Sequence, residues 1–160
     1  RRTPTFLTRK VTTSLTRIKL GLQDVLTLGN LEAKRDLGYS PNYVRGMWLI
    51  LQQDKPDDFV LATGETHTVR EFLEECLNYL QFNWVCDENN SYFNRDDGKL
   101  IVKIDSKFFR PSEVDLLLGD ALKAKRLLGW KSTVKFKELV RIMIDSDLQL
   151  AERELKFATD

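Results

Sequence analysis

The sequence is poor in the residues that build metal sites and disulfide frameworks. It contains one histidine, His67, and two cysteines, Cys76 and Cys86, so neither a structural metal site nor a disulfide is expected. No signal peptide is apparent, and no apolar run approaches the roughly 20 residues that a membrane span needs. Reduced thiols and a cytoplasmic location are therefore the expectation.

A large net charge of one sign is also missing. The chain has 25 Lys and Arg residues against 24 Asp and Glu residues, which gives a formal net charge of +1. No basic field is available to hold nucleic acid or an anionic membrane surface, so any anion site must come from the local placement of a few cations. The 160 residues, 42% hydrophobic and 31% charged, are typical of one globular domain with a core.

Two motifs of dinucleotide-dependent enzymes are absent as well. There is no Gly-x-Gly-x-x-Gly turn after a predicted strand, and no tyrosine is followed four residues later by lysine. The chain begins with Arg1-Arg2 rather than methionine and enters predicted structure almost at once. We therefore expect it to be a piece of a longer polypeptide.

Apolar periodicity and turn signals predict helices and strands that mix without a regular βαβ alternation. Helices are predicted at 10–22, 40–53, 68–80, 120–128 and 136–154, and strands at 24–28, 59–62, 83–87 and 100–104. The polar stretch 88–98 is predicted to be a loop. His67 is interpreted as structural, and the tryptophans as core residues: Trp48, Trp84 and Trp130.

Local signals predict where several of these helices begin and end. Ser40 precedes Pro41 and is the expected N-cap of the second helix. Thr68 and Glu71 have the spacing of a capping box at the start of the third. Gly129 follows the 120–128 helix, where a left-handed C-cap is expected.

Two charged motifs indicate a ligand-binding site: Lys34-Arg35-Asp36 and Arg110-Pro111-Ser112-Glu113-Val114-Asp115. An arginine fork binds phosphate through parallel charged hydrogen bonds, and a glutamate three residues later can accept from hydroxyl groups, such as those of a ribose. Two arginines from distant segments with one acceptor would suit a diphosphate that has a sugar on each side. Surface ion pairing is the alternative.

These two motifs belong to a longer sequence pattern. The chain also contains Phe6-Leu-Thr-Arg-Lys10, Leu28-Gly-Asn-Leu-Glu-Ala-Lys-Arg-Asp36, Tyr43-Val-Arg-Gly-Met-Trp-Leu49 and Asp58-Phe-Val-Leu-Ala-Thr-Gly-Glu-Thr-His-Thr-Val-Arg-Glu-Phe72. With Phe109-Arg-Pro-Ser-Glu-Val-Asp115, this pattern closely resembles the C-terminal half of the GDP-mannose 4,6-dehydratase family, which are extended short-chain dehydrogenases/reductases. The resemblance runs up to about Glu154.

The resemblance implies an α/β fold that is the substrate-binding part of this superfamily, with the N-terminal Rossmann half missing. Residues 1–155 would form the substrate-binding portion, with elements that dock on the missing Rossmann sheet, and 156–160 a tail. The family converts GDP-mannose to GDP-4-keto-6-deoxymannose and water, the first step of GDP-fucose synthesis, with NADP as cofactor. The full-length enzymes form homodimers or homotetramers.

The resemblance also implies roles for individual residues. The catalytic Tyr, Lys, Thr and Glu of the family lie upstream of the region that this chain resembles. No residue of this chain is therefore assigned as catalytic, and the chain alone is expected to be inactive. The NADP is held mainly by the missing half. The implied binding residues are Lys10, Arg35 and Arg110 for the diphosphate, Glu113 for ribose or guanosine donors, Asn30 for the guanosine end, and Arg2 for NADP.

Simpler alternatives remain for some of these residues. Lys10 as a solvated residue at a helix start, Asn30 as a turn former and Glu113 as a partner of Arg110 are each compatible with the sequence. At the protein level, the alternatives are another nucleotide-sugar epimerase or reductase of the superfamily, and a non-catalytic nucleotide-sugar-binding relative.

The chain departs from the family pattern beside Arg35. Leu37, Tyr39 and Asn42 stand where family members usually have Trp, His and Asp. Because these positions follow the expected phosphate-binding arginine, they put the local shape of the site, and turnover with it, in question.

Overall fold

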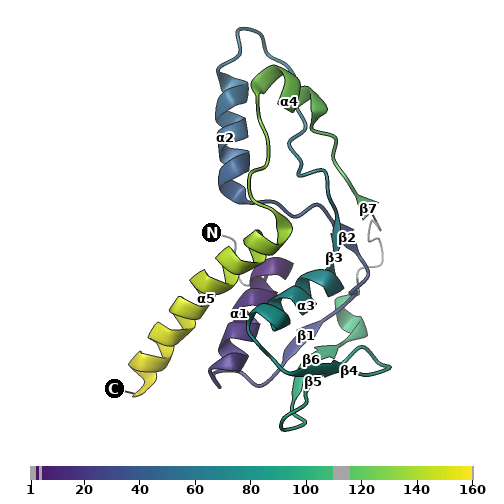
Figure 1. Cartoon of the computed structure of the whole chain (residues 1–160), viewed down its shortest axis with the longest axis vertical. Coiled ribbons are helices and arrows are strands. Elements are labelled where there is room, and N and C mark those ends of the chain that lie inside the picture. The colour runs from purple at the N-terminus through teal and green to yellow at the C-terminus, as the bar shows by residue number, and fades with distance from the viewer. Residues whose placement is uncertain (1–2, 4, 110–115, 160) are drawn as a thin grey trace.

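The computed structural model describes residues 3, 5–109 and 116–159 of the chain (Figure 1). Three of the predicted binding residues, Arg2, Arg110 and Glu113, lie outside the described residues. The described part is a mixed α/β structure in which two lobes are joined by a small sheet, as the sequence analysis predicted at the level of fold class.

The larger lobe, here called the sheet lobe, contains a four-stranded sheet in the order β1-β6-β5-β4. These strands are β1 (Leu26–Leu28), β6 (Leu100–Ile104), β5 (Tyr92–Asn94) and β4 (Trp84–Cys86). Strands β1 and β6 are parallel, with Leu26 opposite Val102, and the other pairs are antiparallel. A single turn of 3-10 helix, η1 (Ser106–Phe108), follows β6.

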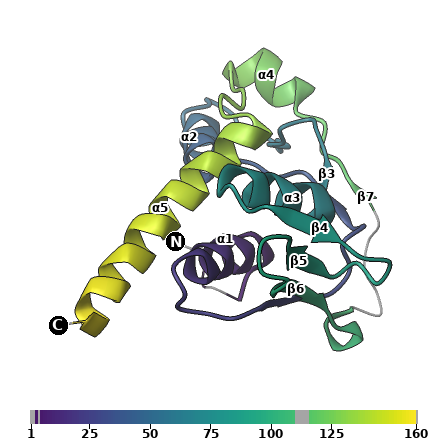
Figure 2. The same ribbon diagram turned by 60° about the horizontal axis from the view of Figure 1, so that its bottom comes forward.

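Three helices pack on one another beside this sheet: α1 (Leu7–Lys19), α3 (Val69–Tyr79) and α5 (Phe136–Thr159). Figures 1 and 2 both show α1 and α3 between α5 and the strands. The core of the lobe unites all of these elements, with Val11 of α1, Phe72 of α3, Val102 of β6 and Val140 of α5 almost completely buried. A polar contact joins two of the helices, because the buried Asp147 pairs with Arg9 and accepts a hydrogen bond of 2.6 Å from Thr12.

The smaller lobe, here called the α2–α4 lobe, contains α2 (Ser40–Leu51), α4 (Leu122–Leu128) and the extended segments 57–66 and 118–121. It lies at the opposite end of the molecule from the four-stranded sheet (Figure 1). A three-stranded sheet of order β3-β2-β7 connects the lobes. It consists of β3 (His67–Thr68), β2 (Lys34–Arg35) and β7 (Leu116–Leu117).

Several local predictions are confirmed. Thr68 and Glu71 form the predicted capping box at the start of α3, and Gly129 ends α4 with φ of 63° in the left-handed region. The strand at 83–87 is the edge strand β4. Both cysteines are free thiols.

Other predictions are wrong. The stretch 88–98 contains strand β5, because Tyr92 is buried and packs into the core although most of the stretch is polar. The N-cap of α2 is Tyr39 and not Ser40, and no side chain caps this helix. Gly46 lets α2 pack closely on segment 57–66, because a Cβ atom at position 46 would lie only 2.5 Å from the Leu61 side chain.

The burial expected for one tryptophan and the strand predicted at 59–62 are also wrong. Trp48 lies on the open side of α2 and exposes 59% of its surface, whereas Trp130 is buried and Trp84 is partly buried. The strand predicted at 59–62 is extended chain without a partner strand among the described residues.

None of the helices in the part of the chain that the structure describes combines the length and the apolar character needed to cross a lipid bilayer.

Candidate nucleotide-binding edge

The parallel strands β1 and β6 end side by side, and their carboxyl ends form one edge of the sheet lobe. Leu28 is opposite Ile104 at the ends of the strands, and the Asp105 N–H continues the pairing by donating to the Leu28 carbonyl at 2.9 Å. In open α/β sheets, ligands bind outside the carboxyl ends of parallel strands. We call this region, comprising Thr27 to Asn30 and Asp105 to Phe109, the β1–β6 edge.

The chain leaves β6 through a turn that is held by several hydrogen bonds. The Asp105 carboxylate accepts from the Lys107 N–H at 2.9 Å, and the Phe108 N–H donates to the Asp105 carbonyl at 3.1 Å. Gly29 lies against this turn, since a Cβ atom at this position would come within 2.5 Å of the Phe108 carbonyl oxygen. A residue with a side chain at position 29 would therefore displace the turn.

Lys10 reaches this edge from α1. Its ammonium donates to the Thr27 carbonyl at 2.6 Å and lies 4.3 Å from the centroid of the Phe108 ring, a cation–π contact. Burial lowers the pKa of Lys10. The lysine predicted from the resemblance is therefore a partly desolvated cation at the carboxyl ends of two parallel strands, which is a suitable place for an anion.

Asn30 follows β1 directly at the same edge. Its side-chain oxygen accepts from the Glu32 N–H at 2.8 Å, which shapes the turn between β1 and β2. This contact agrees with the turn-forming alternative, and it leaves the predicted guanosine contact a prediction.

Arg35 lies in β2, between β3 and β7. Its partners across the small sheet are His67 and Leu117, and its guanidinium donates to the Lys34 carbonyl at 2.7 Å. The predicted convergence of Arg35 with Arg110 falls outside the described residues and stays a prediction.

Asp36 has a role that the sequence analysis missed. Its carboxylate accepts from the Thr63 hydroxyl at 2.7 Å and from the N–H groups of Thr63 and Gly64 at about 3 Å. The last residue of Lys34-Arg35-Asp36 therefore fastens the turn after segment 59–62 to the end of β2. The signal for this contact was the Thr63-Gly64 turn pair, whose free amides need an acceptor.

The departures from the family pattern take part in packing and hydrogen bonding within the fold, Leu37 in the sheet lobe and Asn42 in the α2–α4 lobe. Leu37 packs partly buried against the sheet-lobe core, and Tyr39 precedes α2. The Asn42 carbonyl accepts from the Trp130 indole at 2.7 Å, and its side chain contacts Ser132 and Thr133. None of the three shows a contact with the β1–β6 edge among the interactions of the described residues.

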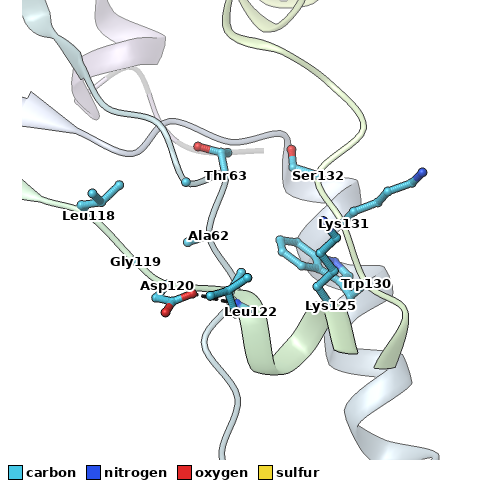
Figure 3. Close-up of a pocket in the computed structure, with 12 residues that line it drawn as sticks. Ala62, Thr63, Leu118, Gly119, Asp120, Leu122, Lys125, Trp130, Lys131 and Ser132 are labelled. Carbon is cyan, nitrogen blue, oxygen red and sulfur yellow. Dashed lines mark hydrogen bonds between the residues drawn. The ribbon is translucent and has the colours of Figure 1, made fainter. Parts of the chain in front are cut away.

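The structure also contains a hollow of about 550 Å³ in the α2–α4 lobe (Figure 3). It lies between the chain at 62–64, the segment 118–122 and the residues after α4, 130–132. Two of its polar groups already serve the fold: the Asp120 carboxylate accepts from the Leu122 N–H at 2.8 Å, and the Trp130 indole donates to the Asn42 carbonyl. Lys10, Asn30 and Arg35 do not line it.

The single histidine contacts two neighbours. The His67 ring stacks on Phe136, with centroids 3.7 Å apart, and its Nδ1 lies 3.2 Å from the Glu71 carboxylate. These contacts agree with the structural interpretation of His67, since they tie β3 to α5 and to the start of α3.

Comparison with known proteins gives a consistent result. The family model described as GDP-mannose 4,6 dehydratase matches residues 1–143. GDP-mannose 4,6 dehydratase 2 of Arabidopsis thaliana is 53% identical over 154 residues, which are 96% of this chain and 38% of that protein. The human GDP-mannose 4,6 dehydratase is 47% identical over 153 residues, 94% of this chain and 41% of that protein. The chain thus spans about two fifths of the length of these relatives.

Solved structures agree on the fold. RMD from Pseudomonas aeruginosa, in complex with NADPH, superposes with a TM-score of 0.73 over 92% of this chain and 44% of its own, at 17% identity. A UDP-glucuronic acid 4-epimerase from Bacillus cereus superposes with a TM-score of 0.68 over 94% of this chain and 42% of its own, also at 17% identity. The described fold is part of the extended short-chain dehydrogenase/reductase fold, as predicted.

Proposed function

Because the chain belongs to the GDP-mannose 4,6-dehydratase family, we propose that it is the part of such an enzyme that binds the nucleotide of GDP-mannose. The proposed overall reaction converts GDP-mannose to GDP-4-keto-6-deoxymannose and water, as the first step of GDP-fucose synthesis. Interactions with a remote GDP can be used to hold the hexose where the chemistry takes place.

The observation that supports this proposal best is the position of Lys10 at the β1–β6 edge. Its ammonium is fixed by the Thr27 carbonyl and by the Phe108 ring, so little side-chain freedom remains to be lost when a phosphate binds. Charge-assisted hydrogen bonds to phosphate are about twice as strong as neutral ones. We assign Lys10 and Arg35 to the diphosphate, with Arg110 on its other side.

The remaining proposed contacts concern the nucleoside and the cofactor. Asn30 would face the guanosine end and Glu113 the ribose or guanosine donors. NADP would accept and return a hydride in the proposed reaction, and the only residue of this chain assigned to it is Arg2. The described residues contain no dinucleotide-binding turn, so we derive no step through the cofactor and assign no catalytic residue here.

We also propose that the α2–α4 lobe docks on the part of the enzyme that this chain does not contain. On α2, Val44, Met47, Trp48 and Leu51 are spaced so that they share one face of the helix, and each exposes between 58% and 80% of its surface. An apolar stripe of this kind is expected to be covered by another surface.

Segment 59–62 indicates that the covering surface includes a β-strand. Phe59 and Leu61 pack on the small core of the lobe, whereas Val60 and Ala62 lie against Gly119 on the other side. This alternation is that of a β-strand. Within the described part of the chain, however, the main-chain groups of 59–62 form no hydrogen bonds. We infer that a strand from the rest of the enzyme pairs with them.

The direct test of the function is a product assay on the longest native polypeptide that contains this sequence. Incubation with GDP-mannose and NADP should yield a 4-keto-6-deoxy sugar nucleotide, whereas residues 1–160 alone should yield none. Unchanged substrate with the longer polypeptide, or turnover by these 160 residues alone, would contradict the proposal.

A binding experiment tests the site itself. Arg35→Ala should weaken GDP binding at least about 30-fold, since loss of a charge-assisted hydrogen bond costs about 2 kcal/mol. Lys34→Ala is the matched control, because successive residues of a strand point to opposite faces, and it should change the affinity by less than about threefold. Equal effects of the two variants would show that the site assignment is wrong.

A further inference from the structure

Phe108 is held in place at the β1–β6 edge and yet remains half exposed. The turn from Asp105 to Phe109 is closed by hydrogen bonds to the Asp105 carbonyl and to the Ser106 carbonyl, of 3.1 and 3.0 Å. Gly29 lies in direct contact with the Phe108 main chain and Cβ. In spite of these contacts, 53% of the Phe108 surface is exposed.

The Phe108 ring has two different faces. The Lys10 ammonium lies over one of them, 4.3 Å from the ring centroid, and it is held there by its hydrogen bond to Thr27. Since 53% of the Phe108 surface is exposed beside this contact, the ring still has surface that a ligand can reach. An aromatic face that is open to solvent and fixed in position is a suitable surface for a planar π-system.

A nucleotide provides such a π-system together with a negative charge. Bases stack on aromatic side chains, and the phosphates of the same ligand would be attracted by the cation that lies at this ring. The edge thus offers, through two residues in mutual contact, one surface for a base and one charge for a phosphate.

We propose that Phe108 is the platform on which the base of the bound nucleotide stacks, with Lys10 supporting the ring from its other face. This inference rests on the proposed function, because it assumes that a nucleotide occupies the β1–β6 edge. It makes Phe108 a ligand-positioning residue, a role that the sequence analysis did not assign to it.

The test separates the base from the phosphates. GDP and inorganic pyrophosphate are titrated calorimetrically against the longest native polypeptide that contains this sequence, and against its Phe108→Leu variant. Leucine keeps an apolar side chain of similar volume but lacks the ring. Phe108→Leu should weaken GDP binding about tenfold or more, as expected for a lost base stack, and should leave pyrophosphate binding within about twofold.

Two further variants complete the design. Phe108→Tyr keeps an aromatic face and should bind GDP like the unchanged protein. Phe109→Leu is the matched control, since Phe109 is equally exposed but has no contact with Lys10 among the described interactions, and it should also bind GDP normally.

The possible failures are distinguishable. If Phe108→Leu binds GDP as tightly as the unchanged protein, or loses GDP and pyrophosphate equally, the stacking proposal is wrong while the proposed function stands. A larger loss of GDP binding in Phe109→Leu than in Phe108→Leu would also overturn it. If the unchanged protein binds neither ligand, the nucleotide site itself is wrong and the stacking proposal fails with it.

Discussion

The two lobes differ greatly in how far they bury their own apolar residues. Among the described residues, the main core, which lies in the sheet lobe, contains 18 buried residues that come from helices α1, α3 and α5, from the strands of the four-stranded sheet and from the segment after β1. The α2–α4 lobe has a core of three, Ala124, Leu128 and Trp130, while Trp48 and Leu51 of the same lobe are largely exposed. Because apolar burial is the dominant favourable term in folding, the stability of this chain resides in the sheet lobe.

This difference has a counterpart in function. The β1–β6 edge belongs to the well-packed lobe, which can hold Lys10 and Phe108 in fixed positions, as a binding site requires. The α2–α4 lobe has no comparable support and presents an apolar helix face and an unpaired extended segment. Among the described residues, the sheet lobe thus supports the positions of Lys10 and Phe108 in the proposed site, whereas the α2–α4 lobe presents the apolar face that we propose is covered on assembly.

The largest expected effect is on the free energy of unfolding when a core residue of the sheet lobe is truncated. Phe72→Ala removes a ring that is 1% exposed and should cost about 4 kcal/mol. Trp48→Ala removes a larger but mostly exposed ring and should cost less than about 1 kcal/mol in this chain. Urea denaturation of both variants checks the contrast, and equal losses would contradict the division of the chain into a stable and a dependent lobe.

The buried polar contact between α1 and α5 should have the next largest effect. Asp147→Ala leaves Arg9 and Thr12 without their common partner, and loss of one member of a buried ion pair costs about 3 kcal/mol. The control is Glu152→Ala, on the same helix but exposed, which should change the stability by no more than about 0.5 kcal/mol. Comparison of the two denaturation midpoints decides whether this contact holds the sheet lobe together.

The pH dependence of stability should report on the same core. Burial first, and then the charges of Glu75 and Asp147, raise the pKa of the Cys76 thiol above its ordinary value of 9.0. The unfolded chain then releases this proton at lower pH than the folded chain does. Stability is therefore fully present below pH 9 and should fall above it by about 1.4 kcal/mol per pH unit.

Replacement of the thiol isolates this effect. In Cys76→Ala, the part of the decrease in unfolding free energy above pH 9 that this thiol causes should disappear. Cys86→Ala, at a half-buried cysteine of β4, should retain that decrease. Denaturation curves between pH 8 and 11 make the comparison. An identical slope in the unchanged protein and in Cys76→Ala would refute the assignment.

The smallest effect concerns one helix start in each lobe. Thr68→Ala removes the hydrogen bond of 3.0 Å that its hydroxyl accepts from the Glu71 N–H and should destabilise the chain by about 1 kcal/mol. Ser40→Ala should have almost no effect, because no side chain caps α2. If Ser40→Ala destabilised the chain as much as Thr68→Ala does, Ser40 would be the N-cap of α2, as the sequence predicted.

Features that depend on a few neighbouring residues could be predicted from the sequence. The capping box of α3 needs only Thr68 and Glu71, and the end of α4 needs only Gly129. Strand β5 could not be predicted, because its three residues lie between polar, turn-forming residues and form a strand only through pairing with β4 and β6. Segment 59–62 was predicted to be a strand, but a strand also requires a partner, which the described residues do not supply.

The candidate site also has features that could be predicted from the sequence and features that could not. The assignment of Lys10 to the site was implied by the family resemblance alone, whereas Arg35 was also indicated by the charged motif Lys34-Arg35-Asp36. The contact of Lys10 with Phe108 joins residues almost 100 positions apart, and no local pattern contains it. The binding of Asp36 to the Thr63-Gly64 turn is likewise a tertiary contact, and periodicity and motif spacing do not report on such contacts.

Hydrogen exchange at Val60, Leu61 and Ala62 tests the contrast between the lobes most directly. The chain is measured alone and after co-expression with the part of the Arabidopsis relative that it does not match. The amides of 60–62 should exchange rapidly in the chain alone and become protected in the complex, while those of Ile101 and Val102 in β6 should be protected in both. Amides of 60–62 that are equally protected with and without the added part would contradict the account.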